Sequence, residues 1–124
     1  MQNFEQIQDL MKVDMKKVDD ILINRLDTEV DLINQMSRYI ITSGGKRLRP
    51  LLLLLCAKAT GYEGKHHYPL AVVIELIHTA TLLHDDVVDE SNIRRGGDSA
   101  NEIWGNAASV LVGDFLYSRA FEIM

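Results

Sequence analysis

The sequence predicts an all-α fold, because apolar residues recur at helical spacing along much of its 124 residues and no segment alternates with the two-residue period of a strand. Glycine, proline and polar clusters interrupt the periodic segments at only a few points. Hydrophobic residues make up 47% and charged residues 25% of the chain, which is a globular composition. We therefore expect residues 1–124 to form a single domain of packed helices around one core.

The first expected helix covers residues 13–41. Its apolar side chains recur at steps of three, four or seven, so that one stripe faces a core. The positions are Val18, Leu22, Leu26, Val30, Ile33 and Ile40. Ser43-Gly44-Gly45 ends this helix, and Pro50 suits the first turn of a second helix, which runs to Thr60 and stops at Gly61.

A third helix is expected to begin near Tyr68-Pro69 and to run towards Asp89. It is apolar on most sides, which is typical of a helix in the middle of a bundle. Residues 90–99, rich in Gly, Asp, Ser and Arg, are expected to form a loop, and residues 100–124 a last helix. That helix ends on Phe121-Glu122-Ile123-Met124 without a capping glycine or proline, so we expect the chain to be cut short.

Charge and composition argue against several classes of protein. With a net charge of -5 and widely spread acids, the chain has no electrostatic footprint for nucleic acid. No apolar stretch approaches the ~18 residues of a membrane span and the N-terminus lacks a signal segment, so we expect a cytoplasmic protein without a transmembrane helix. The single cysteine, Cys56, cannot form an internal disulfide, and its run of leucines predicts a buried, inert thiol.

The end of the third helix carries the acids Asp85, Asp86 and Asp89. On a helix, Asp85 and Asp89 lie about one turn apart on one face, with Asp86 at the edge of the same arc. Carboxylate oxygens suit Mg²⁺, whereas Zn²⁺ would want His and Cys ligands that this cluster lacks. The cluster therefore indicates a magnesium site, and the alternative is a solvated acidic helix end.

Two basic segments accompany the acids, namely Arg94-Arg95-Gly96-Gly97 and Gly44-Gly45-Lys46-Arg47-Leu48-Arg49-Pro50. Arginine forks match phosphate oxygens, and neighbouring glycines let backbone amides approach an anion. Each segment alone is typical of a solvated patch, but together with the acids they indicate a pyrophosphate site. His78, two turns before Asp85, is either a ligand of a second anion or a satisfied core residue, and His84 is expected to point to a different side.

Taken in order, these motifs resemble the trans-isoprenyl diphosphate synthase family. The matching residues are Gly44-Gly45-Lys46-Arg47-Leu48-Arg49-Pro50, His78-Thr79-Ala80, His84-Asp85-Asp86-Val87-Val88-Asp89-Glu90-Ser91 and Arg94-Arg95-Gly96. The stretch from Gly105 to Phe115 is most similar to bacterial octaprenyl diphosphate synthases of quinone (ubiquinone) biosynthesis. The resemblance spans almost the whole chain and implies about four or five N-terminal helices of the antiparallel isoprenyl synthase bundle.

The resemblance also implies a reaction, in which an allylic diphosphate ionises with the help of Mg²⁺ and isopentenyl diphosphate attacks the carbocation before a proton leaves. The implied catalytic and metal-binding residues are Asp85, Asp86 and Asp89. The implied substrate-binding residues are Arg94 for the allylic diphosphate and Lys46, Arg49, His78 and Arg95 for isopentenyl diphosphate. Short-chain members of the family carry bulky aromatics at the positions of Ala80 and Thr81, so these small residues imply a long product.

The chain departs from the family because nothing after Arg95 supplies its second aspartate-rich motif, and Asp114 is a single acid for which we expect a structural role. We therefore expect part of a long-chain synthase that is inactive alone. Two alternatives stay open: a docking or regulatory subunit that binds prenyl diphosphate or a full-length synthase, and a terpene cyclase, which would not need Lys46, Arg49 and Arg95. A bundle without its later helices would expose apolar surface, so we expect a homo-oligomer, a dimer.

Overall fold

The computed structural model describes residues 3–43 and 45–124. Within them the chain forms seven helices and one short hairpin, which confirms the all-α prediction with more and shorter helices than the four or five expected. In order, the elements are α1 Phe4–Leu10, α2 Lys12–Leu26, α3 Asp31–Thr42, α4 Leu48–Ala59, α5 His67–Val88, β1 Ile93–Arg94, β2 Gly97–Asp98, α6 Ala100–Trp104 and α7 Asn106–Ile123.

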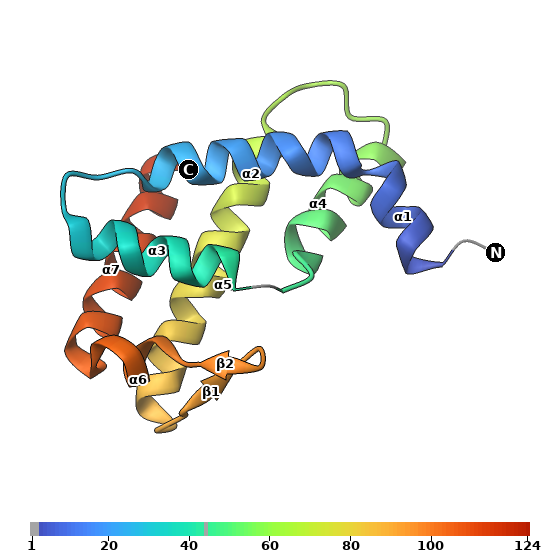
Figure 1. The fold of residues 1–124 in the computed structure, drawn as a ribbon. Helices are drawn as coiled ribbons and strands as arrows, with labels where there is room; N and C mark the ends of the chain where they lie inside the picture. The colour runs from blue at the N-terminus through green and yellow to red at the C-terminus, as the bar shows by residue number, and fades with distance from the viewer. Residues whose placement is uncertain (1–2, 44) are drawn as a thin grey trace.

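The helix expected over residues 13–41 is divided into α2 and α3, which fold back on each other at residues 27–30 (Figure 1). The side chain of Asn34 stabilises this turn, because it accepts a hydrogen bond from the backbone N of Thr28 at 3.1 Å and donates one to its O at 2.6 Å. The apolar period continues through the turn because both helices bury their stripes in the same core. A turn without glycine or proline therefore left the pattern unbroken.

The N-terminal helix α1 was not expected, and the last expected helix is divided at Gly105. A capping box begins α1, in which the side chains of Asn3 and Gln6 each accept a hydrogen bond from the other's backbone N at 2.9 Å. The Asn-x-x-Gln spacing is a sequence signal for such a start. Gly105 has a φ of 90°, which ends α6 before α7 begins.

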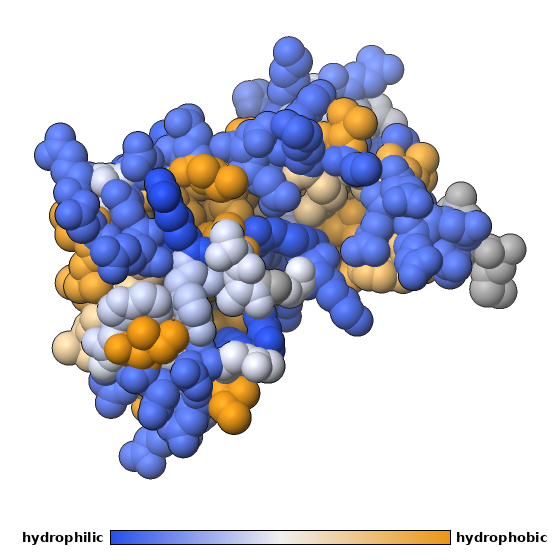
Figure 2. Space-filling model, in the orientation of Figure 1, coloured by the Kyte–Doolittle hydropathy of each residue, from blue (hydrophilic) through white to orange (hydrophobic). Residues whose placement is uncertain are grey.

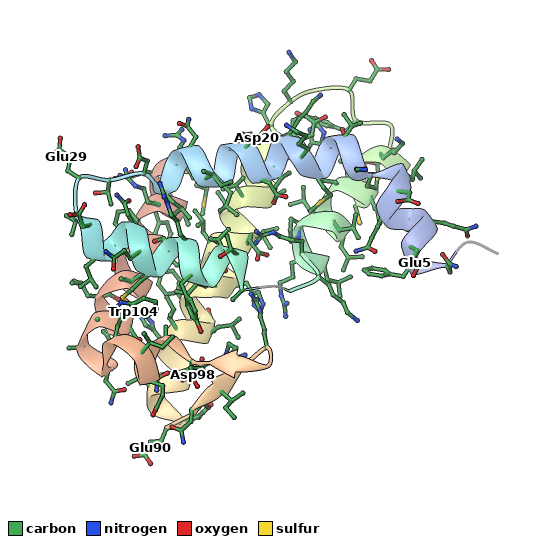
Figure 3. The ribbon with its side chains drawn as sticks, in the orientation of Figure 1. Glu5, Asp20, Glu29, Glu90, Asp98 and Trp104 are labelled. Atoms are coloured by element: carbon green, nitrogen blue, oxygen red, sulfur yellow. The ribbon has the colours of Figure 1, made fainter. Side chains whose placement is uncertain are left out.

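The expected loop over residues 90–99 contains a tight antiparallel hairpin of β1 and β2. Arg95 and Gly96 between the strands have φ values of 53° and 78°, the positive pair that a two-residue hairpin turn requires. The hydroxyl of Tyr39 on α3 donates to the backbone O of Asp98 at 2.6 Å, which ties the hairpin to the helices. Figure 3 labels Asp98 on this hairpin, below α3 in that view. Each strand has only two residues, so no alternating pattern could reveal it.

Helix α5 lies at the centre of the fold, as its apolar character predicted. It runs antiparallel beside α7 and also packs against α4 and α2, which crosses it (Figure 1). Large side chains that are almost completely buried include Leu22, Met36, Leu54, Leu76 and Leu116. Each such burial stabilises the fold by about 1.5–3 kcal/mol, and this packing fixes α5, the helix that carries the acids.

The outer surface is mainly polar on the face drawn in Figure 2, where apolar side chains form separate patches. Large apolar residues that are exposed include Val88 at the end of α5 and Phe121 on α7. No helix in the described part of the chain is both long enough and apolar enough to cross a membrane.

Cys56 is exposed, which corrects the prediction of a buried thiol. Only Pro50, Leu51 and Leu54 of α4 are buried, and Cys56 lies about 200° around the helix from Leu54. We expect Ellman's reagent to modify this thiol in the folded protein nearly as fast as in denaturant. A thiol that reacts only after unfolding would contradict its exposed position.

Candidate functional site

The acidic end of α5 presents two carboxylates to solvent. Asp85 and Asp89 are exposed, and no side-chain bond joins either to another described residue. The backbone N of Asp89 donates to the O of Asp85 at 2.8 Å, so the two residues close the last turn of the helix. Like charges one turn apart at a helix C-terminus repel each other and the helix dipole. A cation bound there would therefore relieve an existing repulsion.

Asp86 is placed differently, because it is buried and bonded to Arg94. Nε of Arg94 donates to Oδ2 of Asp86 at 2.7 Å, and Nη2 donates to Oδ1 at 2.5 Å. The hairpin positions Arg94 for this two-pronged contact, and the hydrogen bond to Asp86 raises the pKa of the guanidinium. The sequence had suggested that Asp86 binds metal and Arg94 binds substrate. In the structure the two side chains instead bind each other.

In consequence, the described residues contain no group of three or more His, Cys, Asp or Glu side chains arranged around one metal position. Asp85 and Asp89 stay available, whereas both carboxylate oxygens of Asp86 already accept hydrogen bonds from Arg94. The three-carboxylate metal site remains a prediction.

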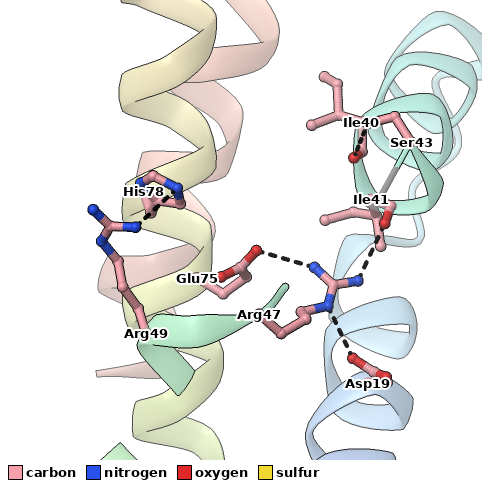
Figure 4. A network of polar contacts seen from close by, with 8 residues as sticks. All are labelled: Asp19, Ile40, Ile41, Ser43, Arg47, Arg49, Glu75 and His78. Atoms are coloured by element: carbon pink, nitrogen blue, oxygen red, sulfur yellow. Dashed lines mark hydrogen bonds and ion pairs between the residues drawn. The ribbon is translucent and has the colours of Figure 1, made fainter. Parts of the chain in front are cut away.

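Arg49, in the first turn of α4, contacts α5 at His78. Nη1 of Arg49 lies 3.2 Å from Nε2 of His78 (Figure 4). Because arginine can only donate, Nε2 must accept and the imidazole must be neutral in this contact. Burial and then the charge of Arg49 lower the pKa of His78, and Arg95 and Arg94 lower it further against the opposing effect of Glu75. Cationic side chains from two distant segments thus act on the pKa of His78.

Arg95 also reaches the segment before α4. A Cβ built on Gly45 would lie 2.8 Å from Cζ of Arg95, so this glycine leaves room for the guanidinium. Burial lowers the pKa of Arg95, and Arg47 and Arg94 lower it further, against the opposing effect of Glu75. Three of the four residues predicted to bind isopentenyl diphosphate therefore lie near one another.

Lys46, the fourth of these residues, points elsewhere. Its Nζ lies 5.8 Å from the centroid of the Phe4 ring on α1. Lysine is flexible and Lys46 is exposed, so its role in binding stays a prediction.

His84, for which no role was expected, joins α5 to α7. Its Nε2 lies 3.2 Å from the backbone O of Val110 and 3.4 Å from Oδ1 of Asp114. Asp114 therefore has a partner on α5, in keeping with the structural role expected for it. A Cβ on Gly113 would lie 2.3 Å from Nε2 of His84, so the helices approach this closely only because residue 113 is glycine.

Gly113→Ala is accordingly expected to destabilise the protein by about 1–2 kcal/mol, because the clash outweighs the ~1 kcal/mol gain in helix propensity. Urea denaturation would measure this change. In a His84→Ala background the clash disappears, and the same substitution should become stabilising. Stabilisation by Gly113→Ala in the wild-type background would contradict the contact.

Of the two positions implied in chain length, Thr81 contacts α7 and Ala80 lies in the core. Ala80 is completely buried. The hydroxyl of Thr81 donates to the backbone O of Ile77 at 2.8 Å and lies 3.0 Å from the hydroxyl of Tyr117, which must be the donor in that second contact. Sequence reasoning missed Tyr117, because nothing in the spacing of residues predicts which side chain of α7 faces Thr81.

Comparison with known proteins shows that the chain belongs to the polyprenyl synthetase family, whose model matches residues 30–124. It is 56% identical over 122 residues to the octaprenyl diphosphate synthase of Escherichia coli strain K12. It is 50% identical over 124 residues to that of Haemophilus influenzae. These alignments cover 98% and 100% of this chain but 38% of each relative, so the chain spans less than two-fifths of their length.

Solved structures agree with this assignment. A decaprenyl diphosphate synthase from Rhodobacter capsulatus superposes with a TM-score of 0.93 and 46% identity over 97% of this chain and 37% of that one. A polyprenyl synthase from Caulobacter crescentus CB15, complexed with calcium and isoprenyl diphosphate, gives a TM-score of 0.95 and 47% identity over 98% of this chain and 37% of that one. The family and fold expected from the motifs are confirmed. These relatives are prenyltransferases.

Proposed function

We propose that this chain carries the first metal and diphosphate site of a long-chain trans-polyprenyl diphosphate synthase. The observation that carries the proposal is the pair of exposed, unbonded carboxylates Asp85 and Asp89, which end the same helix that holds the Arg49–His78 contact. The reaction proposed is Mg²⁺-dependent condensation of isopentenyl diphosphate with an allylic diphosphate. The names of the relatives favour an octaprenyl product, used in ubiquinone side chains.

The donor set at the end of α5 fits Mg²⁺. This ion is usually held by one or two carboxylates, together with waters and substrate phosphates, and Asp85 and Asp89 provide that number. When bound, Mg²⁺ would neutralise the charge that develops on a departing diphosphate. The calcium and isoprenyl diphosphate in the Caulobacter complex support a divalent cation beside such a ligand.

The remaining residues of the site bind and orient substrate in this proposal. Arg94, held by Asp86, supplies a fixed cation for the allylic diphosphate. Arg49, neutral His78 and Arg95 take the diphosphate of isopentenyl diphosphate, with Lys46 moving in from its place beside Phe4.

The chain is proposed to bind substrate but to turn it over poorly by itself, as a cytoplasmic homodimer. The alternative is a non-catalytic docking or regulatory subunit that binds prenyl diphosphate or a full-length synthase. Both proposed functions use the same binding site. Measuring substrate turnover in the presence of a full-length synthase distinguishes them.

Calorimetric titration with farnesyl diphosphate, an allylic diphosphate, tests the proposed site. We expect saturable binding in Mg²⁺ and its loss in EDTA. Asp98→Asn, which changes an exposed acid on the hairpin, is a matched control and should bind as the wild type does. Equal heats with and without Mg²⁺ would contradict a metal-bridged diphosphate.

A further inference from the structure

Arg47 joins the segment before α4 to three different helices (Figure 4). Its Nη1 donates to Oε1 of Glu75 on α5 at 3.0 Å, and its Nη2 donates to the backbone O of Ile41 on α3 at 3.2 Å. Its Nε lies 3.2 Å from Oδ1 of Asp19 on α2. Two guanidinium nitrogens of Arg47 thus donate hydrogen bonds inside the protein, and the third forms an ion pair.

Two features show that this arrangement is held firmly. The side chain of Glu75 is only 4% exposed and that of Arg47 19%, and a buried carboxylate is costly unless it is paired. The backbone of Arg47 has a φ of 52°, a left-handed conformation that costs a residue other than glycine roughly 1–2 kcal/mol. Such a conformation persists only where surrounding contacts impose it.

The anchor lies next to the candidate substrate contact. Glu75 and His78 are three residues apart on α5 and therefore share a face, and Arg47 and Arg49 are two apart on the segment that approaches it. The Arg47–Glu75 and Arg49–His78 contacts are consequently neighbouring links between the same two stretches of chain. Sequence reasoning missed Glu75, although a lone acid in an apolar helix is itself a signal of a buried partner.

We propose that Arg47 is a positioning residue, which fixes the segment from Gly45 to Arg49 on α2, α3 and α5 so that Arg49 lies against His78. Arg47 itself need not touch substrate. The geometric part of this inference stands alone, whereas its consequence for isopentenyl diphosphate rests on the proposed function.

The imidazole of His78 reports the position of Arg49 directly. The groups that shift its pKa include Arg49, Glu75, Arg95 and Arg94, in addition to burial. A displacement of Arg49 after substitution of Arg47 therefore changes the pKa of His78. If Arg49 withdraws and water enters, the two largest of the causes that lower the pKa of His78 weaken together.

NMR titration of the His78 imidazole in Arg47→Met tests the geometric part. We expect the pKa to rise towards the ordinary value of 6.5. Arg25→Met removes an exposed arginine of α2 and should leave His78 unchanged. Leu116→Ala loosens the core on α7 and should lower stability without moving the pKa. An unchanged pKa of His78 in Arg47→Met, or an equal rise of that pKa in Leu116→Ala, would overturn the inference.

Calorimetric titration with isopentenyl diphosphate tests the consequence for binding, where Arg47→Met should weaken the affinity by about tenfold or more. If the wild type does not bind, the proposed function fails while the His78 result still decides the positioning role. If both bind equally, Arg47 does not position the site. If Arg47→Met fails to fold, Arg47→Lys replaces it. Lysine keeps a cation beside Glu75 but lacks the fork that also reaches Ile41. Arg47→Lys should therefore raise the pKa of His78 and weaken the affinity in the same directions but to a smaller degree.

Discussion

Replacing Asp85 and Asp89 together by asparagine is expected to weaken Mg²⁺-dependent binding of farnesyl diphosphate by at least about a hundredfold. Asparagine keeps the size of the side chain but removes the negative charge that a hard cation requires. Neither carboxylate is bonded to another described residue, so the loss would not come from broken contacts within the protein. Titration calorimetry in Mg²⁺ would measure it.

The same double variant should be slightly more stable than the wild type, by about 0.5 kcal/mol, because two like charges disappear from a helix C-terminus. Thermal unfolding without ligand or metal provides this control. Lost binding together with raised stability identifies a functional pair of acids. A large fall in stability would instead mean that Asp85 and Asp89 hold the fold, contrary to their exposure.

Asp86→Ala is expected to have the opposite profile, with a loss of about 2–3 kcal/mol of stability. The substitution leaves Arg94 without its two-pronged partner, and Asp86 itself is only 3% exposed. Arg94→Ala should cost at least as much, about 3 kcal/mol, because it leaves the buried carboxylate of Asp86 without its cation. Urea denaturation of both single variants and the double variant would give the coupling between them.

An exposed ion pair on α7 serves as a control for the urea denaturation of these variants. Glu122→Ala breaks the contact between Glu122 and Arg119 on α7, at a residue that is 58% exposed, and should cost about 0.5 kcal/mol or less. If Asp86→Ala proves as mild as Glu122→Ala, the Asp86–Arg94 contact does not hold the hairpin on α5, and Asp86 returns as a candidate metal ligand.

The fold was predictable where long apolar periods decide it. Apolar spacing predicted the central helix α5. The backbone geometry of Pro50 and Gly61 predicted the start and the stop of the helix that contains Pro50. The division at residues 27–30 was not predictable, because Asn34 closes that turn through its side chain while the core stripe continues. The hairpin escaped notice because it depends on an Arg-Gly pair with positive φ rather than on strand periodicity.

For the candidate site, the sequence predicted how residues are spaced along α5 better than the contacts that they make. Spacing placed Asp85 and Asp89 on one face and brought His78 within reach of the same helix side. Spacing could not show that Asp86 turns to Arg94 or that Lys46 lies over Phe4, because these contacts depend on where the hairpin and α1 pack. Glu75, Tyr117 and His84 became meaningful only once their partners on other elements were known.

Diffraction from crystals grown with Mn²⁺ and a non-reactive farnesyl thiolodiphosphate would test the central claim most directly. Mn²⁺ takes the same oxygen ligands as Mg²⁺ and gives an anomalous signal that locates it. We predict an anomalous peak between the diphosphate and the carboxylates of Asp85 and Asp89, with Arg94 still bonded to Asp86. Mn²⁺ bound away from the end of α5, or diphosphate bound there without any metal, would contradict the account.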